Sequence, residues 1–290
     1  MDFRRRLVSG ACGVALLLGT AGLAHASAIL PNAGFNTSTL AANDDGSTGA
    51  VNIGFSVDFF GATFSQLFVN NNGNVTFDNP LSTYTPFALT GGGVPPILAP
   101  FFADVDTGSA GDPVRYGNDT VNGHSAFGVN WNNVDYFSSD PSHVNRNSFQ
   151  LVMLDRSDVA PNDFDFWFNY DQIQWEAGEA SGSDACGQGG DSAHVGYSNG
   201  LSGASNVSYE LPGSGVNGAF LDSGINCAGG LILPGPDALI QHSLNSDVDG
   251  RYIFQVRNGL VVNPVPEPAS LFLMATGLGG AMLRRRRAKA

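Results

Sequence analysis

Two stretches of the sequence carry acidic residues at alternate positions, a spacing that suits cation binding. The first is FFADVDT, in which Asp104 and Asp106 are two residues apart. In an extended strand this spacing puts both carboxylates on one face, where they repel each other unless solvent or a cation lies between them. Calcium prefers such oxygen ligands. We therefore expect either a calcium site at Asp104 and Asp106 or a pair that is exposed to solvent.

The second stretch resembles the first half of an EF-hand loop. Asn245, Asp247 and Asp249 supply oxygens at alternate positions, and Gly250 follows where such a loop turns sharply. The twelfth position is Val256 and not the glutamate that closes an EF-hand loop. The pattern predicts either a calcium site at Asn245, Asp247 and Asp249 or a turn that leads into the next strand.

One short motif suggests nucleophilic catalysis. Residues 196–200 read GYSNG, which matches the G-x-S-x-G pattern of hydrolases and would make Ser198 the nucleophile. That motif requires a helix after the serine, but the following residues, LSGASNVS, are too rich in Gly and Ser to begin one. We predict that the protein is not an enzyme, with a secreted hydrolase as the alternative.

The beginning of the chain predicts export. Three arginines, Arg4 to Arg6, precede the apolar run LVSGACGVALLLGTAGLA and a small-x-small pattern at Ala24 to Ala26. This order is typical of a secretory signal peptide, which we place at residues 1–26. The body that follows is acidic, and the whole chain has a formal net charge of −13. Such a surface repels nucleic acids, so we expect no nucleic-acid partner.

Export also decides how the cysteines are interpreted. Cys12 lies within the predicted signal peptide, so the exported chain keeps Cys186 and Cys227. Two cysteines in an oxidising compartment predict a disulfide between Cys186 and Cys227. The alternative is a reactive thiol near His194, but a thiolate needs an electropositive surrounding that the neighbouring sequence lacks.

Apolar and polar residues alternate over many short spans, which is the pattern of β-strands. We expect strands at residues 51–60, 65–70, 74–77, 126–137, 147–155, 163–175, 193–197, 206–211 and 251–256. Gly- and Asn-rich clusters between them predict turns, and no segment of ten or more residues in this body has helical spacing. The fold class is therefore all-β: an antiparallel, β-sandwich-like single domain over residues 27–258 with long Gly/Asn/Ser-rich loops.

The strand at residues 163–175 changes its pattern part-way. Its apolar residues first occupy even-numbered positions and then odd-numbered ones, which would place them on opposite faces of a regular strand. A β-bulge near Asp171 and Gln172 would return them to one face, so we predict a bulge there. These residues are Phe164, Phe166, Phe168 and Tyr170, followed by Ile173 and Trp175. We expect them to form core, with an exposed aromatic platform for sugar stacking as the alternative.

The expected strands also form a characteristic succession of blocks. In order they are LFVNNNGNVTF, ILAPFFADVDT, AFGVNWNNVDYF, NSFQLVMLDR, DFDFWFNYDQIQW, HVGYSNG and GRYIFQVRNG, and the opening Asp44-Asp45-Gly46-Ser47 precedes them. This succession resembles the nidogen-type extracellular domain, NIDO, and covers most of residues 40–258. The resemblance implies a cell-surface or matrix-associated module with a role in cell–matrix adhesion, and it implies no catalytic residues.

The end of the chain differs from the body. After an expected linker at residues 259–264, the segment 265–290 combines a Pro-Glu-Pro box, an apolar stretch and an arginine cluster. The residues are Pro266, Glu267 and Pro268, the stretch 269–283, and Arg284, Arg285, Arg286 and Arg287. This arrangement resembles the PEP-CTERM sorting signal. It implies export in bacteria that make exopolysaccharide and processing by a membrane protease, the exosortase.

The length of the apolar stretch indicates how it meets the membrane. A helix over residues 269–283 would span about 22 Å, compared with about 30 Å for the hydrocarbon core of a bilayer. The arginines favour the cytoplasmic side. We expect a short C-terminal hydrophobic helix that anchors the protein transiently in the inner membrane. The alternative is an ordinary tail anchor, in which the Pro-Glu-Pro box has no role.

These features together predict a secreted adhesion or structural protein of the cell surface or exopolysaccharide matrix. Its expected partners are the exosortase and extracellular polysaccharide or other matrix components. The alternative is a calcium-dependent carbohydrate-binding module, for which Ca²⁺ would be the cofactor.

Overall fold

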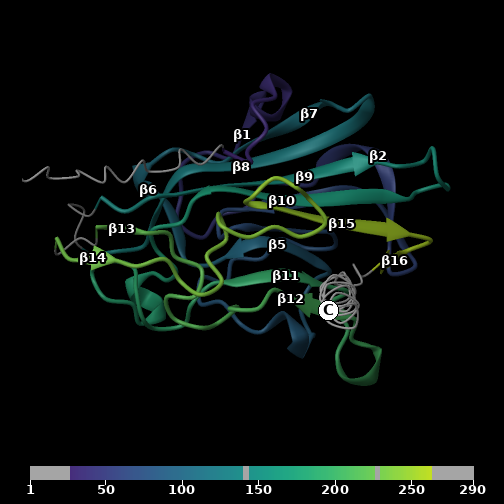
Figure 1. The fold of residues 1–290 in the computed structure, drawn as a ribbon. Coiled ribbons are helices and arrows are strands. Elements are labelled where there is room, and N and C mark those ends of the chain that lie inside the picture. The colour runs from purple at the N-terminus through teal and green to yellow at the C-terminus, as the bar shows by residue number, and fades with distance from the viewer. Residues whose placement is uncertain (1–26, 140–143, 226–228, 263–290) are drawn as a thin grey trace, which may run out of the picture.

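Strands make up most of the folded chain. The computed structural model describes residues 27–139, 144–225 and 229–262. Within these residues two large antiparallel sheets pack against each other, with a small two-stranded ribbon beside them (Figure 1). The helical segments described are short 3₁₀ turns, at Ala33–Asn36, Leu89–Gly91, Glu179–Ser181 and Gly203–Ser205. The predicted all-β sandwich is confirmed.

The larger sheet has eight strands in the order β1-β7-β8-β9-β10-β15-β16, with β6 paired to β8. Its strands are β1 (Ser38–Thr39), β6 (Val105–Gly111), β7 (Arg115–Val121), β8 (His124–Tyr136), β9 (Asn147–Asp155), β10 (Phe164–Gln172), β15 (Arg251–Arg257) and β16 (Leu260–Val262). Strand β8 is the longest and pairs with β6, β7 and β9. It therefore joins β6 to the rest of this sheet.

The smaller sheet has six strands in the order β12-β11-β5-β4-β3-β2. Its strands are β2 (Val51–Phe59), β3 (Ala62–Asn70), β4 (Asn74–Thr76), β5 (Ile97–Phe102), β11 (His194–Ser198) and β12 (Ser208–Glu210). The separate ribbon pairs β13 (Gly224–Ile225) with β14 (Leu231–Ile232). The chain passes from the smaller to the larger sheet between β5 and β6, through Ala103 and Asp104. We call these two residues the crossover.

Strand β10 buries side chains on both of its faces. Phe164, Phe166, Phe168 and Tyr170 lie in the core between the sheets. The ring of Phe166 stacks on Phe254 of β15 with centroids 4.8 Å apart. On the other face, Trp167 packs in a smaller cluster with Phe35. The N-terminal segment that carries Phe35 thus covers part of the outer face of the larger sheet.

The predicted β-bulge is confirmed. The pairing of β9 with β10 shifts register between Tyr170 and Gln172, and the residues that follow turn back towards the core. Ile173 and Trp175 are both 0% exposed. The alternative of an exposed aromatic platform is wrong, because the whole aromatic set of this strand is buried.

Three longer strands, β5, β6 and β7, were absent from the expected set, and local sequence explains β5 and β7. Strand β5 contains Pro100, which cannot donate to a neighbouring strand, and the pairing of β5 with β11 shifts register at that point. Strand β7 reads RYGNDTV, whose Gly, Asn and Asp look like turn residues. It pairs with β8 through a tight turn at Asn122 and Gly123, both of which have positive φ.

The domain extends further than expected at its C-terminal end. Residues 259–264 were expected to form a linker, but β16 begins at Leu260 and pairs with β15 as far as Val262. The turn between the two strands contains Asn258 and Gly259, both with positive φ. The first part of the expected linker is therefore the edge strand of the larger sheet.

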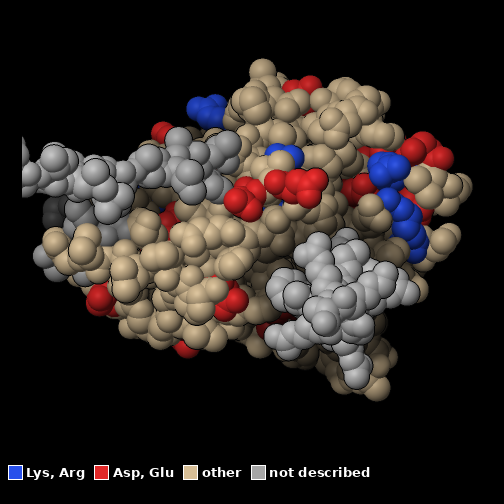
Figure 2. Space-filling model, viewed as in Figure 1, with Lys and Arg blue, Asp and Glu red and all other residues tan. Residues whose placement is uncertain are grey.

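Charged side chains are sparse on the face of the molecule shown in Figure 2. The face shown in Figure 2 has scattered basic side chains and no continuous basic patch. Arg156 pairs with Asp158 and Asp165, and Arg257 also pairs with Asp165. Among the residues that the structure describes, no helix is both long and apolar enough to span a membrane. The predicted signal peptide (1–26) and the sorting signal (265–290) lie outside the described residues.

Candidate metal centre

Three carboxylates from distant parts of the sequence meet at the crossover between the sheets. Asp44 and Asp45 precede β2, and Asp104 lies between β5 and β6. One oxygen of each side chain lies within 4.8 Å of the other two. The structure therefore brings Asp104, a predicted calcium ligand, to two aspartates that were noted only as part of the family resemblance. We call these three residues the acidic cluster.

Asp104 is held tightly by the backbone around it. The side chain is 1% exposed, and its carbonyl oxygen accepts a hydrogen bond of 3.2 Å from the Phe137 N–H group. Gly178 lies directly against the carboxylate, since a Cβ atom at that position would be 2.2 Å from Oδ2 of Asp104. Among the described residues Oδ2 has no hydrogen-bond partner. The Oδ2 atom of Asp104 is thus a buried acceptor that lacks a donor.

Two buried asparagines fix the segment that carries the other two aspartates. Asn72 donates from Nδ2 to Oδ1 of Asp45 over 2.8 Å, while its Oδ1 accepts the Val105 N–H group over 3.0 Å. Asn71 donates from Nδ2 to the carbonyl oxygens of Asp44 and Val105. The β3–β4 turn therefore ties the acidic segment to the start of β6.

The crowding of carboxylates changes their titration. Burial, followed by the charges of Asp44, Asp45 and Asp106, raises the pKa of Asp104 to about 7, and the Ser181 hydroxyl opposes this rise. Burial and the neighbouring Asp45 and Asp106 raise the pKa of Asp44 to about 6. The cluster is therefore a site where negative charge is costly near neutral pH.

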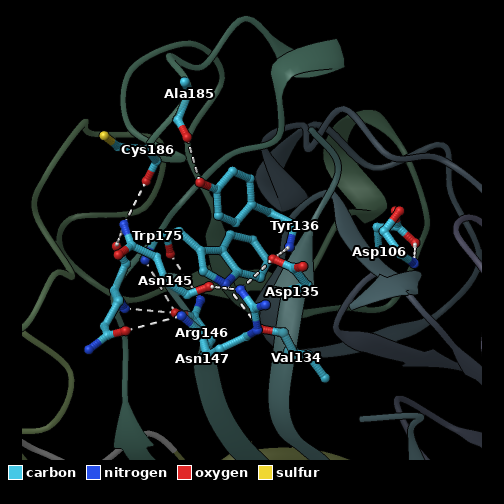
Figure 3. A network of polar contacts seen from close by, with 12 residues as sticks. Asp106, Val134, Asp135, Tyr136, Asn145, Arg146, Asn147, Trp175, Ala185 and Cys186 are labelled. Atoms are coloured by element: carbon cyan, nitrogen blue, oxygen red, sulfur yellow. Dashed lines mark hydrogen bonds and ion pairs between the residues drawn. The ribbon is translucent and has the colours of Figure 1, made fainter. Parts of the chain in front are cut away.

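Asp106, the other ligand predicted in this stretch, makes different contacts. Its Oδ1 accepts the Gly108 N–H group over 2.6 Å, and its Oδ2 accepts the Ser109 hydroxyl over 2.6 Å. Figure 3 shows its carboxylate hydrogen-bonded to a nearby nitrogen. Asp106 caps its own turn and acts on the acidic cluster through its charge.

The second predicted calcium site lies in an exposed turn before β15. Asp247 and Asp249 are exposed, and no described acidic or histidine side chains form a metal-sized group with them. Asn245 donates from its side chain to the carbonyl oxygen of Ile253 over 2.9 Å and has a φ of 55°. The contacts are those of a turn that leads into a strand, and calcium binding at this turn stays a prediction.

Ser198 does not have the setting of a hydrolase nucleophile. It ends β11, which pairs antiparallel with β12 and β5, and its side chain is 0% exposed. Its Oγ accepts the Gly200 N–H group over 3.1 Å. The residues that follow form a short 3₁₀ turn at Gly203–Ser205 and not a helix. The strand–serine–helix geometry of a nucleophile elbow is absent here.

A polar network holds the loop that contains Cys186 (Figure 3). Asn145 donates from Nδ2 to the Cys186 carbonyl over 3.0 Å, and the Tyr136 hydroxyl donates to the Ala185 carbonyl over 2.7 Å. Arg146 pairs with Asp135 at 2.9 Å. This network fixes one partner of the predicted disulfide. Cys227 lies outside the described residues, so the Cys186–Cys227 bond stays a prediction.

Glu176 is another buried carboxylate, separate from the acidic cluster. Its oxygens accept the N–H groups of Gly218 and Phe220 over 2.6 and 2.7 Å. Burial raises its pKa from 4.5 to about 7, although these two donors and the Ser192 hydroxyl oppose the rise. The side chain anchors the loop that follows β12.

We expect Glu176→Gln to flatten the pH dependence of stability. Between about pH 4.5 and pH 7 the folded protein keeps a proton on Glu176 that the unfolded chain has released, so stability falls as the pH rises through this window. The shift corresponds to about 3 kcal/mol at most. Urea unfolding at pH 5, 6, 7 and 8 measures it, with the exposed Asp191→Asn as control. Parallel curves for the wild type and Glu176→Gln would contradict the assignment.

Comparison with known proteins agrees with this architecture. The Nidogen-like domain family matches residues 65–122 and 113–258, which together include most strands of both sheets. The chain belongs to the nidogen-like domain family. The PEP-CTERM protein-sorting motif matches residues 264–287. This nidogen-like chain is therefore a secreted surface protein that an exosortase sorts.

The similar curated proteins are much longer. Over 248 residues the chain is 32% identical to mouse (Mus musculus) alpha-tectorin, and over 245 residues it is 27% identical to that of chicken (Gallus gallus). Each alignment covers 76% of this chain and 10% of the relative. The chain thus spans about a tenth of the length of the curated relatives it matches. No solved structure matches the chain.

Proposed function

We propose that this protein is a non-catalytic adhesion or structural component of the bacterial extracellular matrix. The observation that carries the proposal is the presence of a nidogen-like body and a PEP-CTERM motif in one chain. The motif directs the body to the outside of the cell. The body there offers a rigid two-sheet scaffold whose long loops are available for contact with matrix components.

A groove at one end of the smaller sheet, lined by the β2–β3 turn and by residues next to β4, β5 and β11, supports polysaccharide as the partner. It has a volume of about 530 Å³ and is lined by aromatic, proline and amide side chains. Phe60 and Phe64 are half-buried, while Asp78 and Asn79 are exposed. Aromatic faces stack on sugar rings, and carboxylate and amide groups hydrogen-bond to hydroxyls. This combination suits a glycan better than a wholly apolar ligand.

The acidic cluster favours a second candidate, the calcium-dependent carbohydrate-binding module. In that case sugar binding would need the ion, either as a direct ligand of hydroxyl groups or as a support for the loops. The groove and the acidic cluster share no lining residue. The two candidates therefore differ in one measurable property, the effect of a chelator on binding.

We expect the secreted protein to bind exopolysaccharide from an exosortase-bearing host. In a pull-down on immobilised polysaccharide, Asp78→Ala combined with Asn79→Ala should reduce the bound fraction several-fold, because both side chains line the groove. Asp191→Asn serves as an exposed control. Binding that EDTA leaves unchanged supports the adhesion proposal, and binding lost in EDTA supports the calcium-dependent alternative. Failure to bind in both buffers would exclude polysaccharide as the partner.

A further inference from the structure

The acidic cluster of Asp44, Asp45 and Asp104 holds more negative charge than its described surroundings neutralise. No described arginine, lysine or histidine forms an ion pair with any of the three. Buried Oδ2 of Asp104 and buried Oδ1 of Asp44 both lack a hydrogen-bond partner among the described residues. Buried anionic oxygens without donors are costly unless something else satisfies them. A cation would do so.

We propose that Asp44, Asp45 and Asp104 together bind one Ca²⁺ ion. The site differs from the two acidic stretches that the sequence pattern indicated, because two of its three carboxylates come from the segment before β2. The ion would fasten this segment to the crossover between the two sheets. The inference does not depend on polysaccharide binding, because it concerns the fold of the domain and not its partner.

The spacing of the oxygens is suitable for calcium. Two oxygens that share a calcium ion at about 2.3–2.6 Å can be at most about 5 Å apart. One oxygen of each of the three aspartates lies within 4.8 Å of the other two, so they can reach one ion without a large movement. Magnesium demands near-octahedral geometry and gives up its waters reluctantly, whereas calcium accepts irregular shells of six to eight oxygens. We therefore expect calcium to be preferred.

Neutral oxygens border the same cluster. The Thr83 carbonyl accepts a hydrogen bond of 3.2 Å from the Asn72 side chain, which also donates to Asp45. The Ser181 hydroxyl lies in the loop whose Gly178 packs against Asp104, and it donates to Oγ1 of Thr85 over 3.3 Å. Calcium takes six to eight oxygen ligands, so carboxylates, these groups and water can complete its shell.

The position of the site gives the ion a structural effect. The acidic segment continues into Ser47 and Thr48, which bond to β3 of the smaller sheet. On its other side, Asn43 exchanges hydrogen bonds with Thr107 of β6 in the larger sheet. Calcium would remove the repulsion at the one point where this segment, the crossover and the loop at Gly178 meet. Calcium is thus expected to stabilise the packing of the two sheets.

The test is calcium-dependent thermal unfolding of the secreted, metal-free protein. Extracellular calcium modules have a Kd of about 10⁻⁴–10⁻³ M, so 10 mM Ca²⁺ should raise the Tm by about 3–10 °C, and 10 mM Mg²⁺ should raise it much less. Calorimetric titration should give one ion per chain. No rise in Tm with calcium in the wild type would overturn the proposal.

The variants test the ligand set. Asp104→Asn should abolish the calcium response and, in EDTA, should be at least as stable as the wild type because one repelling charge is gone. Asp45→Asn, at a half-buried position, should also abolish the calcium response. It replaces Asp104→Asn as the test variant if that protein does not fold. Asp247→Asn, an exposed control, should respond like the wild type. A response lost in Asp247→Asn and kept in Asp104→Asn would place the ion in the turn before β15 and contradict the proposal.

Discussion

Gly73→Ala is expected to prevent folding of the domain, whereas Gly123→Ala is expected to be tolerated. Both glycines occupy turns with positive φ, 70° at Gly73 and 85° at Gly123. A Cβ atom at Gly73 would lie 1.7 Å from the carbonyl oxygen of Phe101, but at Gly123 it would meet nothing within 4 Å. The backbone strain is similar at the two sites, so the difference between the variants measures the collision with β5.

The size of the effect follows from what the β3–β4 turn holds. The Gly73 carbonyl accepts the Phe101 N–H group over 3.1 Å, so a shift of the turn breaks a contact with a central strand. It also displaces Asn71 and Asn72, which position the acidic segment. We expect Gly123→Ala to cost about 1 kcal/mol through its φ alone. Gly73→Ala should cost more than about 4 kcal/mol, a large share of typical domain stability.

Urea unfolding and the yield of soluble secreted protein measure both variants. Gly73→Ala should give little soluble protein, and any that remains should unfold at a much lower urea concentration than Gly123→Ala. Equal midpoints for the two variants would mean that the turn can move away from Phe101 at no cost. The described packing between the β3–β4 turn and β5 would then be wrong.

Local alternation of apolar residues was enough to predict most of the two sheets. Strands such as β9 and β10 place every second side chain in the core between the sheets, and that period is visible in the sequence. The bulge in β10 was also visible, because the change of parity between Tyr170 and Ile173 has no other simple explanation. In β5 no alternation exists, because all six of its residues are buried on one face or the other. Strand β7 was hidden by its turn-forming residue types.

The acidic cluster could be predicted only in part. Asp104 was recognised from its spacing to Asp106, but the structure joins it to Asp44 and Asp45, about 60 positions earlier in the chain. Such a contact depends on how the segment before β2 meets the crossover, which no local pattern records. One signal did exist. Asn71 and Asn72 were interpreted as turn residues, but they are buried and bridge the two segments through their side chains.

The sorting signal leads to the second large effect, which concerns release from the membrane. The matched motif at residues 264–287 includes Pro266, Glu267 and Pro268 and the apolar stretch that follows. We expect export to pause when this stretch enters the bilayer, with the terminal arginines retained on the cytoplasmic side. Prolines on both sides of Glu267 disfavour helix there, so the backbone should be accessible to a protease just outside the membrane.

Glu267→Ala should therefore leave nearly all of the protein in the membrane fraction of a host that has the exosortase. The wild type should appear outside the cell with a mass that lacks the tail, because cleavage near the Pro-Glu-Pro box removes the apolar stretch. Ser270→Ala, which lies next to the box but outside it, is the matched control and should be released like the wild type. Intact-mass measurement of the released and membrane-bound species provides the readout. A wild-type protein that still ends at Ala290 in such a host would show that the tail is a lasting anchor, since processing would then have left it in place.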